Sequence, residues 1–246
     1  MIRNETPIPA VPAGQRIYAI GDIHGRLDLL DELLQMIRLD DEEQAPIERR
    51  TLIFLGDYID RGAESRGVVE RLLTGIPNGF ECICLKGNHE EFLLRSLTDP
   101  STVPLWMANG GMETLGSYGV IRRDLPGAPI RAQYLGPALE KALPESHLAF
   151  FRRLPLWVTF GDYFFVHAGV KPGVPLAEQD EYDCLFIRDP FLSSRGWFGK
   201  MIVHGHTPVL EPEVRSNRIG IDTGGFFTGH LTALRLEGEE RGFLAT

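Results

Sequence analysis

Hydrophobic residues in the first hundred positions alternate between short β-branched runs and longer stretches with helical spacing. Leucine and isoleucine recur every three or four residues from Arg26 to Arg38, which predicts an amphipathic helix. Further helices are predicted over 65–73 and from Asn88 to Leu97. The apolar runs that precede the three helices predict strands over 16–20, 51–55 and 81–85. This strand–helix order predicts an α/β fold with parallel strands.

The second half of the chain changes pattern twice. Residues 103–154 are mostly helical in character and are interpreted as a helical insertion, or cap. Strand patterns then return, with Gly161-Asp162 as a tight hairpin turn. These later strands predict a second sheet packed on the first, over 156–160, 163–166, 201–203, 218–221 and 231–236. No linker or repeat divides the chain, so a single domain over 1–246 is expected, with an N-terminal arm over 1–15.

A glycine-led polar segment follows each of the first three predicted strands. Because ligand sites in parallel sheets form beyond the carboxyl ends of the strands, these segments are expected to meet. Two glycine-associated histidines, His167 and His206, also follow predicted strands. Any one Asp here would also suit a helix cap, but the whole set favours a metal site. The candidate metal ligands are Asp22, His24, Asp57, Asn88, His167 and His206.

These residue types indicate the class of metal. Carboxylate and amide oxygens combined with imidazole nitrogens suit Mn, Fe or Zn better than Ca. Six groups are enough for two divalent ions if one carboxylate bridges them. Asp57 belongs to the middle segment and is the natural bridge.

Five motifs, in this order, are GDIHG, GDYIDRG, GNHE, HAG and GHTP. Together they resemble the bacterial and phage-type members of the phosphoprotein phosphatase (PPP) family, within the calcineurin-like metallophosphoesterases. The resemblance runs from about Arg16 to Leu236. It implies a four-layer αββα sandwich, with the site in the loops above the central sheets. It also implies one metal on Asp22 and His24, a second on Asn88, His167 and His206, and Asp57 as the bridge.

The resemblance carries a mechanism as well. Two divalent ions, with Mn²⁺ as the first choice and Fe or Zn as alternatives, would share a hydroxide that attacks phosphorus in line. Arg61, Arg188 and Asn88 would bind the phosphate oxygens. His89, oriented by Asp60, would protonate the leaving group.

His204 leaves a choice open, because it forms an HxH pair with His206 and both would face one way on a strand. The resemblance places the ligand after Gly205, so a packing or supporting role is favoured for His204. Phe226 and Phe227 are expected to line the core or a pocket.

Composition limits the partners and the compartment. The formal net charge of −9 argues against non-specific binding of nucleic acid or anionic membranes. No apolar run reaches the roughly 20 residues that span a bilayer. Three cysteines without a CxxC motif favour a reduced, cytoplasmic protein. The acidic run 40–43 is predicted to be a solvated loop. Oligomeric state is left undetermined.

Four functions are weighed, and two of them are favoured. The main prediction is a dimetal phosphomonoesterase of the serine/threonine protein phosphatase type, favoured by the Asp60-Arg61 pair and by His24. The alternative is a hydrolase of dinucleoside polyphosphates such as diadenosine tetraphosphate. A nuclease or cyclic phosphodiesterase is disfavoured, because Pro208 stands where such relatives place a further histidine. A non-catalytic phosphate-binding regulatory module is also disfavoured, since no ligand or acid is missing. The substrate would be a phosphorylated protein or peptide, or a nucleotide polyphosphate.

Overall fold

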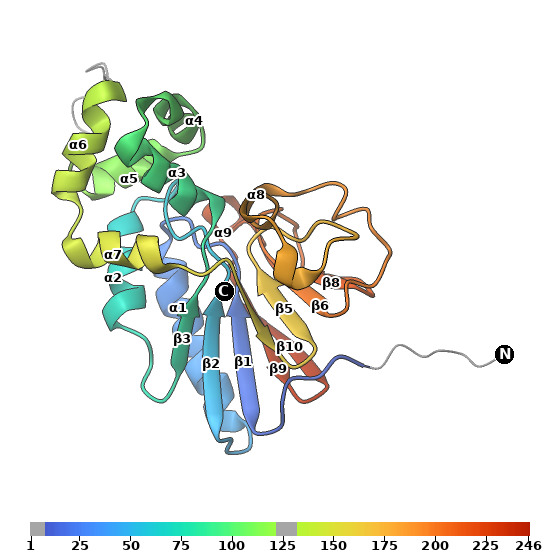
Figure 1. Ribbon diagram of the computed structural model, residues 1–246. Coiled ribbons are helices and arrows are strands. Elements are labelled where there is room, and N and C mark those ends of the chain that lie inside the picture. Colours follow the sequence, from blue (N-terminus) through green and yellow to red (C-terminus); the bar gives the residue numbers. More distant parts are fainter. Residues whose placement is uncertain (1–7, 122–131) are drawn as a thin grey trace.

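Two five-stranded sheets stacked face to face form the centre of the molecule (Figure 1). The structure is a computed structural model that describes residues 8–121 and 132–246. The first sheet has the order β10-β9-β1-β2-β3. Its strands are β1 (Gln15–Ile20), β2 (Arg49–Phe54), β3 (Glu81–Cys84), β9 (Thr232–Glu237) and β10 (Glu240–Ala245).

The parallel half of this sheet confirms the strand–helix prediction. Strands β1, β2 and β3 run parallel, with Ile17 opposite Thr51. The connecting helices are α1 (Leu27–Glu43) and α2 (Ser65–Thr74), and α3 (Asn88–Thr98) follows β3. The strand predicted over 231–236 was wrongly assigned to the second sheet, because as β9 it pairs antiparallel with β1 in the first sheet. Strand β10, which the sequence pattern did not predict, pairs antiparallel with β9.

The second sheet has the order β4-β5-β6-β8-β7. Its first two strands form the predicted hairpin, with Phe160 opposite Tyr163 across the Gly161-Asp162 turn. Strands β5, β6 and β8 are parallel to one another, so their carboxyl ends also meet at one edge. The strands are β4 (Trp157–Phe160), β5 (Tyr163–Val166), β6 (Met201–His204), β7 (Glu213–Val214) and β8 (Arg218–Gly220).

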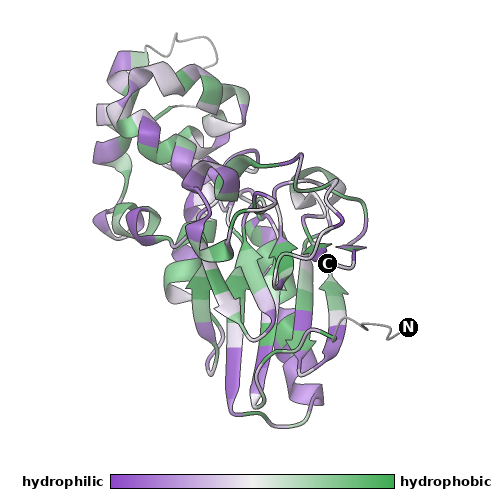
Figure 2. Cartoon of the chain, turned by 45° about the vertical axis from the view of Figure 1, so that its right-hand side comes forward, coloured by the Kyte–Doolittle hydropathy of each residue, from purple (hydrophilic) through white to green (hydrophobic). Residues whose placement is uncertain are grey.

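The alternation of side chains along the strands creates three apolar layers. Ile17 and Ile53 of the first sheet meet Phe165 and Val203 of the second sheet in the layer between them. Figure 2 shows that these central strands are mainly hydrophobic. On the other face of the first sheet, residues such as Tyr18 pack with α1 and α2. Each layer removes apolar surface from water, which is the main stabilising contribution to the fold.

The outer face of the second sheet is covered by the chain between β5 and β6. Phe164 and Ile202 pack there against Val170, Cys184 and Phe191. This covering segment contains η2 (Leu176–Glu178) and α8 (Glu181–Phe186), and the rest of it is loop. The αββα layering is therefore confirmed, although the outer layer on this side contains little helix.

The range 103–154 contains four helices: α4 (Val103–Ala108), α5 (Gly111–Ser117), α6 (Ala132–Ala142) and α7 (Glu145–Arg153). Residues 122–131 of this range lie outside the described residues. The turn η1 (Pro100–Thr102) leads into α4. In Figure 1, α4, α5 and α6 gather around the end of α3, beyond the carboxyl edge of the first sheet. Trp106 and Leu139 join the same apolar cluster as Leu93 of α3, so these helices extend the main core.

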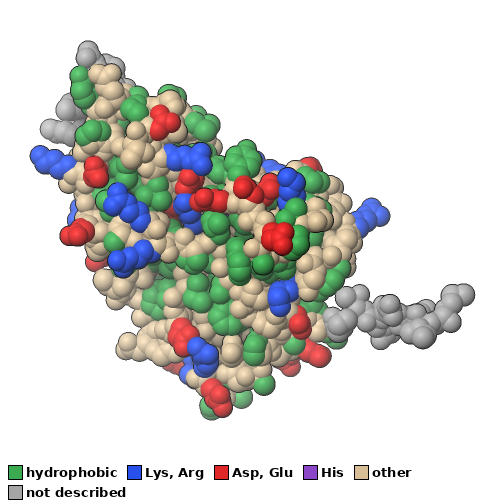
Figure 3. Space-filling view, viewed as in Figure 1, with side chains coloured by type: hydrophobic (Ala, Val, Ile, Leu, Met, Phe, Trp, Pro, Cys, Tyr) green, Lys and Arg blue, Asp and Glu red, His purple; other side chains and the backbone are tan. Residues whose placement is uncertain are grey.

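The described part of the N-terminal segment packs along the sheets. The Val11 N–H donates to Gly238 O, and the Asp162 N–H donates to Ala10 O, so this segment connects the turns of two hairpins. No helix within residues 8–121 and 132–246 is long and apolar enough to cross a bilayer. The face drawn in Figure 3 carries interspersed side chains of both charge signs.

The prediction of a solvated loop over 40–43 is wrong. These residues form the last turn of α1, and two of them, Asp40 and Asp41, supply counter-charges to arginines of the sheet. Arg16 on β1 is fully buried, and its guanidinium lies 2.5 Å from Asp41 and 2.7 Å from Glu237. Asp41 also pairs with Arg50 at 2.7 Å. A buried charge is stable only with such partners, and the sequence pattern gave no sign that Arg16 is buried.

We therefore expect Asp41→Ala to lower the free energy of unfolding by about 3 kcal/mol, since it leaves the buried Arg16 with one fewer counter-charge. Glu42→Ala is the matched control, because the Glu42 side chain is 57% exposed and pairs only with Arg38 at the surface. Its expected change is within about 0.5 kcal/mol. Urea unfolding followed by circular dichroism measures both values. Equal effects of the two substitutions would contradict the assignment.

Candidate metal centre and active site

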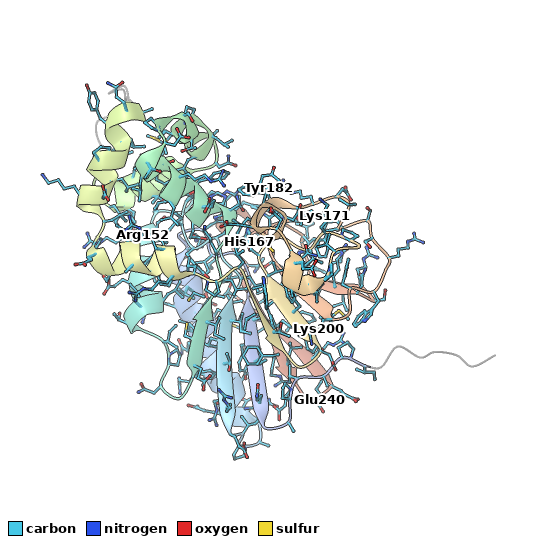
Figure 4. All side chains as sticks on the ribbon, in the orientation of Figure 1. Arg152, His167, Lys171, Tyr182, Lys200 and Glu240 are labelled. Atoms are coloured by element: carbon cyan, nitrogen blue, oxygen red, sulfur yellow. The ribbon has the colours of Figure 1, made fainter. Side chains whose placement is uncertain are left out.

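All five motif segments lie at the carboxyl ends of their strands and meet at one edge of the sandwich. Backbone hydrogen bonds join them directly. The N–H groups of Ile23 and His24 donate to Asp57 O at 3.1 and 2.9 Å, and Gly205 N–H donates to His167 O at 2.8 Å. Figure 4 shows His167 at the upper end of β5, beneath the helical group.

Asp57 lies at the centre of this cluster. It belongs to two groups of buried side chains that could hold a metal ion, and in each group the ligand atoms lie within 4.8 Å of one another. The first group adds His24 and His89, and the second adds His167 and His206. Asp57 Oδ2 is 3.6 Å from His24 Nε2, whereas Oδ1 is 3.4 Å from His167 Nε2. The two carboxylate oxygens thus face different groups, an arrangement that suits a ligand shared by two ions.

The charge state of Asp57 suits this position. Burial acts against its ionised form, but the surrounding histidines, His167 first, hold the pKa of Asp57 well below its usual range. The carboxylate is therefore available to bind cations.

The hydrogen bonds of two histidines fix which nitrogen faces the centre. His24 Nδ1 and His167 Nδ1 each lie 2.9 Å from a backbone carbonyl, that of Ile59 and that of Leu55. Burial lowers the pKa of both imidazoles and favours their neutral forms. A neutral imidazole carries one N–H, which these carbonyls take, so each Nε2 presents a lone pair to the centre.

Asn88 supplies the clearest test of whether a cation fits here. Its Oδ1 lies 2.9 Å from His167 Nε2 and 2.9 Å from His206 Nδ1. The lone pair of His167 Nε2 therefore faces another acceptor, an unfavourable contact that a cation between them would relieve. The donor set, of imidazole nitrogens with amide and carboxylate oxygens, also fits Mn, Fe or Zn.

Asp22 lies beside the two groups but belongs to neither. It is buried, and the His206 N–H donates to its carboxylate at 3.0 Å. Gly205 permits this approach, since a Cβ there would lie 2.1 Å from Asp22 Oδ1. Burial, together with the charges of Asp222 and Asp57, raises the pKa of Asp22. Such crowding of carboxylates is typical of a site whose charge is balanced by bound cations.

His89 and Asp60 form the expected pair. His89 Nδ1 lies 2.6 Å from Asp60 Oδ2, and Trp106 Nε1 donates to the same oxygen at 2.8 Å. Thr114 Oγ1 donates to Asp60 Oδ1 at 2.5 Å. Burial lowers the pKa of His89, but the Asp57 and Asp60 charges outweigh it and raise the pKa overall. His89 is thus suited to hold a proton and to donate it from Nε2.

Of the two predicted phosphate-binding arginines, only Arg61 lies in the centre. Its guanidinium is 2.9 Å from His24 Nε2 and 3.2 Å from His89 Nε2. Arg188 is exposed at the rim. Burial, followed by the His167 charge, lowers the pKa of His206 to about 2, and the Arg188 charge contributes less.

Backbone strain is concentrated in these loops. Among residues 8–121 and 132–246, every non-glycine residue with a left-handed φ lies in this site: His24, Asp57, Asp60, Arg61 and His206, with φ from 47° to 73°. Each such conformation costs roughly 1–3 kcal/mol and is kept only where the surroundings enforce it. The strain therefore marks these loops as functional.

Two supporting acids were missed by the sequence reasoning. The Glu90 carboxylate is fully buried and accepts the N–H groups of Asp57, Tyr58 and Gly87 at 2.8–3.0 Å, which fixes the loop that carries Asp57. Asp222 lies next to Asp22, and burial raises its pKa to about 6. Glu90 belongs to the GNHE motif, but spacing alone assigns no role to either residue.

His204 points away from this centre. It is buried, its Nδ1 lies 3.0 Å from Gly205 O, and its ring meets Phe191 edge to face at 5.0 Å. Neither candidate metal group found in the described residues includes it. These contacts favour the packing role.

The fold and these motifs define the class of protein. Residues 15–231 match the family model described as calcineurin-like phosphoesterase. The chain therefore belongs to the calcineurin-like phosphoesterase family, as the motifs predicted.

Relatives within the family are named as nucleotide hydrolases. A protein from Oceanobacillus iheyensis named bis(5'-nucleosyl)-tetraphosphatase PrpE [asymmetrical] is 28% identical over 246 residues, covering 92% of this chain and 90% of that protein. A protein of the same name from Bacillus thuringiensis is 27% identical over 235 residues and covers 88% of each chain.

Solved structures share the fold. A candidate diadenosine tetraphosphatase superposes with a TM-score of 0.64 at 20% identity, over 96% of this chain and 98% of that one. A serine/threonine phosphatase from Saccharomyces cerevisiae gives a TM-score of 0.52 at 16% identity, over 98% of this chain and 81% of that one. At these identities the likeness concerns the fold alone.

We expect Asp57→Asn to lose most bound metal, because the shared carboxylate serves both groups. His206→Gln should lose metal from the second group only. His204→Gln is the matched control, since its ring packs against Phe191 and belongs to neither group. Metal per chain is measured by inductively coupled plasma mass spectrometry after loading with Mn²⁺ and desalting. A full complement of metal in Asp57→Asn would refute its bridging role.

We expect His89→Asn to reduce kcat/KM for alkyl phosphates by about 10²–10⁴-fold, because their leaving alkoxides need a proton. Aryl phosphates leave as weaker bases and should lose far less. Steady-state kinetics on a phosphothreonine peptide and on p-nitrophenyl phosphate test this difference. Equal losses on the two substrates would rule out the acid role.

Proposed function

We propose that this protein hydrolyses dinucleoside polyphosphates, with asymmetric cleavage of a tetraphosphate into a nucleoside triphosphate and a nucleoside monophosphate. The observation that carries the proposal is the shared name of the relatives, whose similarity extends over about nine-tenths of this chain. The charged centre around Asp57 and Arg61 supports it, because it is suited to a phosphate anhydride as well as to an ester.

In this proposal two divalent ions would bind, with Mn²⁺ as the first choice and Fe or Zn as alternatives. Asp22 and His24 would hold one ion, Asn88, His167 and His206 would hold the other, and Asp57 would serve both. The bound ions would supply a water of lowered pKa for attack on phosphorus and would neutralise charge on the phosphate.

The remaining residues act on the substrate. Arg61 and Asn88 bind oxygens of the phosphate under attack, and the exposed Arg188 contacts another phosphate of the substrate. Water adds to phosphorus and releases one proton to the solvent, while the bond from phosphorus to the bridging oxygen breaks. The departing nucleotide takes the electron pair and receives a proton from His89, which Asp60 orients.

Serine/threonine protein phosphatase activity, the main prediction from the motifs, is the second candidate. It relied on His24 and the Asp60-Arg61 pair. Their contacts serve the metal group and the phosphate, which both substrate classes need, and the proton donor, which a serine or threonine alkoxide needs more than a departing nucleotide does. Because these residues suit both reactions, the names of the relatives decide in favour of the nucleotide.

We expect the protein with Mn²⁺ to cleave diadenosine tetraphosphate at a higher kcat/KM than a phosphothreonine peptide in an equimolar mixture. Chromatography of the products should give ATP and AMP rather than two molecules of ADP. The Asp57→Asn protein, prepared in the same way, controls for contaminating hydrolases. Preference for the peptide would overturn the proposal, and ADP as the product would overturn its asymmetry.

A further inference from the structure

The short helix α9 (Gly225–Thr228) carries two adjacent phenylalanines beside the candidate active site. Phe226 is half-buried, whereas Phe227 is 57% exposed. Their rings meet edge to face, with centroids 4.9 Å apart. Exposure alone does not distinguish Phe227 from other surface aromatic residues, but its position does.

Phe226 connects this pair to the catalytic centre. The Arg61 guanidinium lies 4.6 Å from the centroid of the Phe226 ring. The His24 ring meets Phe226 edge to face at 5.4 Å. Phe226 is thus occupied by contacts with site residues, and Phe227 is one ring further from the phosphate-binding arginine.

The backbone holds the Phe227 ring in place. Gly224 has a φ of +67°, and a Cβ there would lie 2.3 Å from the ring of Phe227, so the ring rests on the bare glycine. Thr228 Oγ1 donates to Thr223 O at 2.8 Å, and Arg26 Nη1 donates to Gly225 O at 2.9 Å. An exposed ring fixed in this way loses little freedom when a flat ligand stacks on it.

We propose that Phe227 is a stacking platform for one nucleobase of the substrate, an inference that rests on the proposed function. In a nucleotide, one ribose separates the base from its phosphate, and one aromatic ring separates Phe227 from Arg61. A phosphate held by Arg61 therefore brings its base within reach of Phe227. Stacking on an aromatic face tolerates any base, so adenine and guanine nucleotides should both gain from it.

The decisive experiment measures inhibition of p-nitrophenyl phosphate hydrolysis by AMP and by ribose 5-phosphate. AMP carries adenine at the anomeric carbon where ribose 5-phosphate carries a hydroxyl, so the ratio of their inhibition constants reports the contribution of the base. In the wild-type protein AMP should bind roughly 5- to 100-fold more tightly than ribose 5-phosphate. In Phe227→Leu the ratio should approach one, and in Phe227→Trp it should be retained.

Phe243→Leu is the matched control, because Phe243 is also an exposed phenylalanine (41%) but lies on β10, within the sheet. It should keep the wild-type ratio. The same variants are assayed on diadenosine tetraphosphate, where Phe227→Leu should raise KM and leave kcat nearly unchanged.

The outcomes separate the two proposals. If the wild-type protein does not cleave the dinucleotide but prefers AMP through Phe227, the proposed function fails and the platform stands. If AMP and ribose 5-phosphate bind equally to the wild-type protein, or if Phe227→Leu keeps the preference, the platform is refuted whatever the substrate.

Discussion

The structure depends on the crowding of acceptor atoms around Asp57. Two histidine lone pairs, the amide oxygen of Asn88 and a buried carboxylate converge within a few ångströms, with Arg61 at their edge. Such an arrangement repels itself unless cations bind between its members. In the absence of bound cations, the surrounding fold must therefore hold these groups in place against their mutual repulsion.

The sandwich provides that restraint. Apolar contacts between the two sheets fix the strands, and each motif begins where its strand ends. Glu90 then accepts three backbone N–H groups and closes the loop that carries Asp57. The left-handed conformations of residues such as Asp57 and His206 persist because these contacts enforce them. The free energy gained from apolar contacts between the layers thus offsets the conformational strain of the loops.

Much of this was predictable from the sequence, because its signals are local. The periodicity of hydrophobic residues and the positions of glycines predicted the parallel strands and the hairpin at Gly161-Asp162. They also predicted the residues that gather at the carboxyl ends of the strands. Contacts between distant segments were not predictable. One such contact is the ion pair between the buried Arg16 and Asp41, which lies in a helix rather than in the predicted loop. Another is the pairing of β10 with β9. Nothing in the local pattern links Trp106 to Asp60. Substrate preference was also beyond the motifs, since they encode chemistry at phosphorus rather than the group attached to it.

The two hydrogen bonds from Trp106 and Thr114 to Asp60 have a consequence for the evolution of this chain. The described helices of 103–154 lie beyond the sheet edge that carries the site, and they also supply the two groups that fix Asp60, the partner of His89. A change in these helices therefore also changes the surroundings of Asp60. A lineage that replaced this insertion to gain a new substrate would have to retain a tryptophan and a threonine at these positions, or rebuild the support of Asp60 in another way. Such coupling narrows the routes by which the insertion can diversify.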